Sequence, residues 1–579
     1  MGILKGKIAA ITKSPLHGIE EIDCTGLVVS PGFVDIHYHG EAKAAAQFYR
    51  VRDGITTSAD TEAGGINLDG HLQQIEKKGL IANHFISSSV IAGHNFAISS
   101  RKNYYIVNKE QQIVNYVKQS PGRYLVFENV PTRYWDQPLS DSKENQSLDK
   151  TLISPTLMDG EVTYHSCYNV SDAVETFSQA TPPMATGNFT KLNEHESYDA
   201  LRMIEWGLQN GGTSIGLLAG YDAFAYEDKL DSAKPVLSNF AKGIHDLAKA
   251  YNCPVVEHGI QQPFALGLAP TLDYVKKING RYHYCHVVST AGHTPEGDKS
   301  KQAVDLIEKL ISDGFHISYE MYPWDAASSS ASAPYWADIK QWPTQGVKPE
   351  NVIEIASKKS LVQIAKENKR TIEAEWNAWK MPPSKSVYVL HCHKQDSLDY
   401  ALTHPHCCVI SDGITSFTGS GHPRRNGTFA RFLRQYTRER QLLSIPDAVR
   451  KMTTLPLSVV ANASESLQHK GQIIVGYDAD ITVFDPKKVT ERATYANPQQ
   501  FSAGIPYVLV NGQFVVRNNQ NVPGVLPGRV IYGQLTAKGR PLIVMPSAKE
   551  LICGTATKKR KSQTTITAME DIHSSNCCP

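Results

Sequence analysis

The stretch "VSPGFVDIHYHG", residues 29–40, joins a run of apolar residues to two histidines that are separated by a single residue. In a β-strand, residues i and i+2 point to the same face, so His37 and His39 would lie side by side while Tyr38 faces away. Two neutral imidazoles on one face form a chelating pair for a divalent metal ion. A surface pair at a strand end is the alternative interpretation, and the rest of the sequence has to decide between them.

The composition indicates a globular protein without an obvious macromolecular partner. The chain has 579 residues, 41% of them hydrophobic and 20% charged. Its 59 basic and 57 acidic residues nearly balance, which gives no electrostatic reason to expect nucleic acid or an anionic membrane as partner. No apolar run approaches the roughly 20 residues of a membrane span, and we find no secretory signal. The ten cysteines contain no C-x-x-C motif, so a cytoplasmic location is expected.

Strand-like apolar runs alternate with amphipathic helical segments over about 400 residues, which favours an α/β fold with parallel strands. The predicted strands or strand ends lie at 54–60, 84–94, 213–221, 253–260, 281–289 and 406–413, and the predicted helices at 199–211 and 237–252, with a further helix–strand unit at 305–324. A helix over 444–463, with Ser444 as its N-cap and Asp447 three residues later, is predicted to close the array.

Histidine or carboxylate residues recur at the carboxyl ends of these strands. They are His37, His39, Glu62, His94, His258, His286 and Asp412. In a (β/α)8 barrel the carboxyl ends of the strands converge on one mouth, where catalytic residues lie. Any one of these residues could be a polar group of the core, but their recurrence predicts a TIM-like barrel with a metal site at its mouth.

The two ends of the chain are predicted to form a second, smaller domain. Residues 1–30 and 464–540 contain short strand-like runs, and Asn-Gly at 511–512 is a hairpin signal. We therefore expect a small β-sandwich domain built from both ends, beside a barrel domain of residues 31–463. Residues 541–579 are rich in Ser and Thr and contain KKRK, and they are predicted to be a disordered tail.

A series of short motifs supports a family resemblance. The motifs are PGFVDIHYH (31–39), GITT (54–57), IAGHNF (91–96), YPWDAASS (322–329), SDG (411–413), HPRRNGTFARFL (422–433), AVRKMTTLPLSVV (448–460), GYDADITVFDP (476–486) and GIPYVLVNG (504–512). Their types and order resemble those of the N-acyl-D-amino-acid deacylases (D-aminoacylases and D-glutamate deacylases), a branch of the amidohydrolase superfamily. The resemblance runs over roughly residues 1–535.

The resemblance implies a set of metal ligands. His37 and His39 match the H-x-H pair of that family, and His258 and His286 match two further histidines of its metal site. Asp412 matches the aspartate on the last barrel strand, which would bind metal and transfer a proton. The expected cofactor is a divalent metal, zinc in the first place, as one or two ions.

Two further residues match positions that contact substrate. Tyr322 matches the first Tyr of a YPY motif, so the resemblance implies that it binds substrate and donates a hydrogen bond to the developing oxyanion. The alternative interpretation is that Tyr322 is an aromatic residue of the core. Arg424 matches the Arg of HPR, which in the family helps to hold the substrate carboxylate, as a guanidinium can with two hydrogen bonds. The alternative interpretation is that Arg424 forms a structural ion pair.

The chain also departs from the family pattern. The family has a metal-binding Cys in a GNCG segment, whereas the corresponding residues 59–65 read ADTEAGG. Glu62 could supply a bridging oxygen in place of that thiolate, and Asp60 is the alternative. Ile260 and Val288 stand where the family has Arg and Lys, so the substrate preference is open.

The resemblance implies a metal-dependent hydrolase that cleaves the amide bond of N-acyl amino acids, D-amino acids in the first place, by attack of a metal-activated hydroxide. Its partner would be this small-molecule substrate, and its oligomeric state is open. One alternative is a cyclic-amide hydrolase of the hydantoinase or dihydroorotase kind. Those enzymes usually carry a carboxylated barrel lysine, and no matching Lys is found. A non-catalytic barrel used for binding is the other alternative, supported by the missing Cys, Arg and Lys.

Overall fold

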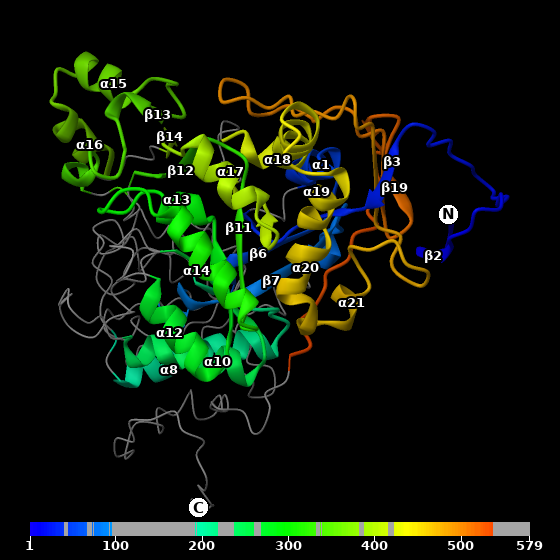
Figure 1. Ribbon diagram of the computed structural model, residues 1–579, viewed down its shortest axis with the longest axis horizontal. Coiled ribbons are helices and arrows are strands. Elements are labelled where there is room, and N and C mark those ends of the chain that lie inside the picture. Colours follow the sequence, from blue (N-terminus) through cyan, green and yellow to red (C-terminus); the bar gives the residue numbers. More distant parts are fainter. Residues whose placement is uncertain are drawn as a thin grey trace, which may run out of the picture.

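The computed structural model covers the barrel, its flanking sheet and an insertion (Figure 1). It describes residues 1–39, 44–65, 75–91, 93–94, 194–217, 237–259, 268–331, 338–380, 387–414 and 422–535, together with Leu72, Leu192 and Trp336. The predicted tail, residues 541–579, lies outside the described residues. No helix within the described ranges is both long and apolar enough to cross a membrane.

Eight parallel strands form the central sheet. In chain order they are β4 (Phe33–Asp35), β6 (Ile55–Gly65), β7 (Asn83–Ser89), β8 (Ile215–Leu217), β9 (Pro254–His258), β10 (Arg281–Cys285), β11 (His316–Met321) and β15 (Cys407–Val409), and each is bonded to the next in that order. Just beyond the sheet, β5 (Tyr38–His39) pairs in parallel with β16 (Gly413–Ile414), which brings the first and last strands together. The predicted TIM-like barrel is confirmed.

Amphipathic helices cover the outside of the barrel (Figure 1). They include α1 (Ala44–Arg52), α8 (Glu194–Gln209), α10 (Asn239–Ala250), α12 (Ala269–Ile278), α14 (Ser300–Ser312) and α17 (Gln395–Thr403). In α10 the hydroxyl of Ser238 accepts the N–H of Ala241 at 3.1 Å and caps the helix, while Phe240, Ile244 and Leu247 bury its inner face.

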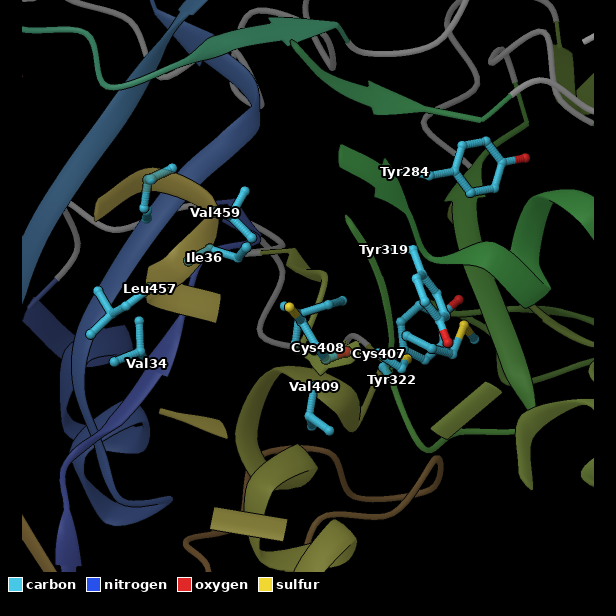
Figure 2. Packing of buried hydrophobic residues seen from close by; sticks show 14 of the residues in the cluster. Val34, Ile36, Tyr284, Tyr319, Tyr322, Cys407, Cys408, Val409, Leu457 and Val459 are labelled. Carbon is cyan, nitrogen blue, oxygen red and sulfur yellow. Dashed lines mark hydrogen bonds between the residues drawn. The ribbon is translucent and has the colours of Figure 1, made fainter. Parts of the chain in front are cut away.

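The prediction of a single helix over 444–463 is wrong in one respect. Ser444 caps it as expected and accepts the N–H of Asp447 at 3.2 Å. The chain then breaks at Thr453, with φ −134° and ψ −86°, into α19 (Ile445–Met452) and α20 (Thr454–Val460). Pro456 explains the break, because its ring would clash with the carbonyl of Met452 and it has no N–H to donate. Figure 2 shows side chains of α20 packed beside the first barrel strand.

Both chain ends contribute to the small β-domain, as predicted. β3 (Val28–Pro31) pairs with β17 (Ile481–Phe484), and the antiparallel sheet continues through β18 (Tyr507–Val510), β19 (Gln513–Arg517) and β20 (Gln520–Asn521). Asn511 and Gly512 form the β18–β19 turn with φ of 48° and 79°, the left-handed backbone that an Asn-Gly hairpin adopts. The hairpin of β1 (Gly2–Leu4) and β2 (Lys7–Ala10) packs on this sheet through Ile8.

One structural unit was not predicted from the sequence. Residues 326–392, hereafter the insert, form an antiparallel sheet of β12 (Ala326–Ser330), β14 (Val387–His391) and β13 (Val352–Glu354), with α15 (Leu361–Glu367) and α16 (Ile372–Lys380). The insert has its own core, centred on Trp342 and Trp376, whose ring centroids are 4.9 Å apart. Since it follows the carboxyl end of β11, the insert borders the mouth of the barrel.

Phe33→Ala is expected to lower the free energy of unfolding by about 3–5 kcal/mol, because it leaves a cavity in the barrel core. Phe33 is fully buried, and its ring stacks on that of Phe429 with centroids 5.8 Å apart. Leu442→Ala, at a side chain that is 42% exposed, is the matched control and should cost less than about 0.5 kcal/mol. Urea unfolding followed by tryptophan fluorescence measures both, and equal losses would contradict this packing.

Candidate metal centre

A buried carboxylate, Glu62 on β6, lies at the mouth of the barrel between two pairs of histidines. Glu62 Oε2 lies 3.1 Å from Nε2 of His37 and 3.3 Å from Nε2 of His39. Glu62 Oε1 lies 2.8 Å from Nδ1 of His258 and 3.0 Å from Nε2 of His286. Each carboxylate oxygen therefore faces one pair, which is the geometry of a bridge between two cation positions.

Asp412 and Arg424 stand on the His37 side of this centre. Asp412 Oδ1 lies 3.6 Å from Nε2 of His37 and 3.7 Å from Nε2 of His39, while its Oδ2 lies 2.8 Å from Nη1 of Arg424. The guanidinium of Arg424 in turn lies over the ring of Tyr322, 4.6 Å from its centroid. The structure thus brings together the residues that the family resemblance implied as ligands or substrate contacts.

Local backbone geometry directs two of these side chains inward. His286 follows β10 with φ 28° and ψ 62°, and Asp412 follows β15 with φ 47°. Positive φ is uncommon for residues other than glycine and is concentrated at functional positions, where the surrounding structure maintains it. For Asp412, a hydrogen bond from its N–H to the carbonyl of His37, 2.9 Å long, holds this turn against the first strand.

Two further carboxylates orient the His37–His39 pair from behind. Nδ1 of His37 contacts Glu320, and Nδ1 of His39 lies 3.0 Å from Oδ2 of Asp60. A carboxylate on one ring nitrogen leaves the other nitrogen directed at the centre, as is typical for metal-binding histidines. Asp60, considered above as an alternative to Glu62, thus lies behind His39 rather than between the histidine pairs.

Glu320 was missed in the sequence. It is buried on β11 and also lies 2.9 Å from Nε2 of His283. The signal was present, because a carboxylate within an apolar strand, two residues before Tyr322, points to the same face as that residue. Because the sequence does not show which side chain faces Glu320 across the barrel, a role in orienting a histidine could not be distinguished from that of a buried structural acid.

The electrostatics of the centre favour bound positive charge. Burial alone would raise the pKa of Glu62, but the imidazoles of His37 and His258 hold it well below its ordinary value. Burial would lower the pKa of His39, yet Asp60 and Glu62 raise it to about 10. The buried carboxylates thus require cations around them, and a divalent metal can supply the charge that protonated imidazoles would otherwise provide.

The donor set fits such a metal. His37, Glu62 and His286 offer ligand atoms that all lie within 4.8 Å of one another, as do His37, His39 and Asp412. Imidazole nitrogens and carboxylate oxygens are ordinary ligands of zinc and similar divalent ions. Nδ1 of His286 is buried and has no hydrogen-bond partner among the residues that the structure describes.

Comparisons with known proteins identify relatives of this chain. The family model described as "Amidohydrolase family" matches residues 403–516. An N-acyl-D-glutamate deacylase from Alcaligenes xylosoxydans xylosoxydans is 29% identical over 347 residues, covering 59% of this chain and 65% of the relative. An N-acyl-D-aspartate deacylase from the same organism is 38% identical over 152 residues, covering 26% of this chain and 29% of the relative. In these segments the chain is similar to proteins of the amidohydrolase family.

A solved structure extends the similarity to the fold. The N-acyl-D-glutamate deacylase of Bordetella bronchiseptica, crystallised with zinc and a phosphonate inhibitor, matches with a TM-score of 0.60 at 19% identity, covering 91% of this chain and 94% of that one. The sequence alignment, by contrast, spans only about two thirds, 65%, of the length of the first relative. The predicted resemblance to the N-acyl-D-amino-acid deacylase branch is confirmed.

Three further positions considered in the sequence lie outside the set of side chains described above. His94 is buried but lies beyond the end of β7 in a helical stretch, not at the strand end where it was expected. Val288 is buried in α13 (Val287–Ala291), so no cation stands at this position, and Ile260 lies outside the described residues. Cys285 lies near His37 and Glu320, and burial raises the pKa of its thiol well above the ordinary value.

Glu62→Ala and Asp60→Ala are expected to differ in metal binding. Removing Glu62 takes away the group shared by both histidine pairs, so at least one equivalent of metal should be lost. Asp60→Ala should keep the stoichiometry and weaken affinity by about 10–100-fold, the usual cost of losing a group that orients a ligand. Zinc titration of both variants beside wild type measures this. Unchanged affinity in Glu62→Ala with loss of metal in Asp60→Ala would reverse the assignment.

Proposed function

We propose that this protein is a metal-dependent hydrolase that cleaves the amide bond of N-acyl amino acids, with D-amino acids as the preferred products. The observation that carries the proposal is the Glu62 carboxylate between two histidine pairs, with Asp412 beside one of them. The curated relatives named as N-acyl-D-glutamate and N-acyl-D-aspartate deacylases support the substrate class.

The metal, zinc in the first place, would be held by His37, His39, Glu62, His258, His286 and Asp412 as one or two ions. When bound, such an ion lowers the pKa of a water ligand toward about 7 and polarises a carbonyl group. Zinc in the Bordetella bronchiseptica deacylase supports this choice of metal.

Asp412 is the proposed proton carrier. Its Oδ1 faces the His37–His39 pair, so it can accept a proton from the attacking water and deliver it to the leaving amine. Its Oδ2 forms an ion pair with Nη1 of Arg424 at 2.8 Å, which favours one orientation of the carboxylate. General acid–base transfer of this kind contributes typically about 10²–10⁴-fold to the rate.

Tyr322 and Arg424 are the proposed substrate contacts. The Tyr322 hydroxyl lies 2.6 Å from Oγ of Ser289, a contact that can orient it to donate a hydrogen bond to the developing oxyanion. Arg424 is buried and engaged with Asp412, yet its Nε has no partner among the described residues. The two interpretations of Arg424 are therefore compatible, because one face of the guanidinium positions Asp412 and another can hold a substrate carboxylate.

The two alternatives have less support. A hydantoinase-like reaction usually depends on a carboxylated lysine as bridge, whereas the group between the two histidine pairs here is the carboxylate of Glu62. A non-catalytic barrel would have no need for a buried proton acceptor that an arginine holds at the mouth. The intact set of histidines and carboxylates therefore favours catalysis over binding alone.

Asp412→Asn should keep the fold and at least one equivalent of metal but lower kcat by about 10²–10⁴-fold, because an amide cannot accept the proton. Asp273→Asn, at a side chain that is 73% exposed, is the matched control and should retain wild-type turnover. Turnover of an N-acyl-D-amino acid and metal content are measured on the same samples. A variant that keeps more than about half of the wild-type kcat would refute this role, given the rate factor expected for proton transfer.

Removal of the metal by a chelator should abolish turnover, and added Zn²⁺ should restore it, because the mechanism needs the metal to lower the pKa of the attacking water. The restored enzyme is then assayed on paired N-acyl-D- and N-acyl-L-amino acids, with acidic side chains among them. A higher kcat/KM for the D series is expected. Full activity in the metal-free protein would contradict the metal-dependent mechanism, and equal rates on both series would contradict the stereochemical assignment.

A further inference from the structure

A second cluster of metal-binding side chains lies outside the Glu62 centre. His293, Cys392 and His393 each offer one ligand atom, and these atoms all lie within 4.8 Å of one another. His293 follows α13 of the barrel, whereas Cys392 and His393 follow β14 of the insert in the sequence HCHK. The fold therefore brings together residues that are about a hundred positions apart, a separation at which no local motif explains their meeting.

Hydrogen bonds fix the tautomer of both histidines. Nδ1 of His293 donates to the carbonyl of Gln345 at 3.0 Å, and Nδ1 of His393 donates to the carbonyl of Trp324 at 2.9 Å. Because a carbonyl oxygen can only accept, Nδ1 carries the proton in each ring, and Nε2 of the neutral ring carries the lone pair. Each imidazole is thus held with its metal-binding nitrogen free of the proton.

The Nε2 atoms of the two histidines make no hydrogen bond within the described part of the chain. Nε2 of His293 and Nε2 of His393 are both buried and lack a hydrogen-bond partner among the described residues. An unsatisfied buried polar atom costs free energy, so two that face one cluster call for an explanation.

The cluster opens on a cavity of about 490 Å³. The cavity is lined by His293, Cys392 and His393 together with residues that include Asp298, Gln345 and Lys394. Cys392 is only partly buried and is among the residues that line this cavity. Three protein ligands beside an open space match the pattern of a zinc ion with one coordination position left for water or another ligand.

We propose that His293, Cys392 and His393 form a second metal site that takes a thiophilic divalent ion such as Zn²⁺. Binding replaces the thiol proton of Cys392 by the metal, so one proton is released for each ion bound. The thiolate distinguishes this site from the Glu62 centre, whose donors are nitrogen and oxygen atoms. The proposal does not depend on the activity assigned to that centre.

The site would connect the insert to the barrel. The N–H groups of Cys392 and His393 donate to the carbonyl of Asp325 at 3.2 and 3.0 Å, which holds the end of β14 in place. The ring of His393 lies 5.6 Å from that of Tyr322, between centroids. An ion shared with His293 would therefore fix the insert at the mouth beside a proposed substrate contact.

The first test is zinc stoichiometry of the full-length protein. Metal-free protein is dialysed against Zn²⁺, and wild type should bind one equivalent more than Cys392→Ser or His293→Gln. Cys24→Ser, at a partly buried cysteine of the β-domain, is the matched control and should bind as wild type does. Equal zinc content in wild type, Cys392→Ser and His293→Gln would overturn the proposal.

The second test follows the thiol itself. Iodoacetamide labelling of Cys392, read by peptide mass spectrometry, should be suppressed by Zn²⁺ in wild type and in Glu62→Ala but not in His293→Gln. If Zn²⁺ still suppresses labelling of Cys392 in Glu62→Ala, this site binds metal independently of the proposed catalytic centre. The two proposals can therefore fail separately. Labelling of Cys392 that is the same with and without Zn²⁺, or protection that survives in His293→Gln, would overturn the second site.

Discussion

The structure depends on one costly feature, an ionised carboxylate buried among four imidazoles. A charge in the protein interior is tolerated only when it is paired and hydrogen-bonded. Glu62 obtains its partners from β9, from the turn after β10 and from the segment that follows β4, so no single element could stabilise it. Only an array of parallel strands whose carboxyl ends converge can bring these elements to one point. The barrel fold is therefore a requirement for burying Glu62 in this centre.

The same requirement explains how the barrel closes. Asp35, at the end of β4, is fully buried and lies 2.8 Å from Nη2 of Arg50 on α1. Its carboxylate also accepts the N–H of Ser411 at 3.1 Å and the N–H of His37 at 3.3 Å. Asp35 thus binds the last strand segment to the first at the point where His37 and Asp412 must meet. Asp35, the aspartate in PGFVDIHYH, therefore helps to close the barrel, a role that the sequence did not reveal.

The sequence predicted the centre well because strand periodicity and strand ends are local properties. The i, i+2 spacing of His37 and His39 predicts a ligand pair, and ADTEAGG offers two acids, Asp60 and Glu62, as the further ligand. Glu320 and Asp60 could not be assigned in this way, because their roles depend on which imidazole lies across the barrel. The insert was missed because its short antiparallel strands are interrupted by helices and resemble barrel units when only the apolar pattern is considered.

The two proposed sites differ in chemical hardness, and this difference follows from a single substitution in the barrel. Where related deacylases are expected to have a thiolate, this chain has Glu62, so the ligands proposed for the barrel centre are imidazoles and carboxylates. The sulfur donor occurs instead at Cys392, beside the insert. Soft ions prefer thiolate, whereas imidazole–carboxylate sites accept a wider range of divalent metals. The two proposed sites should therefore differ in the divalent ions that they bind most tightly.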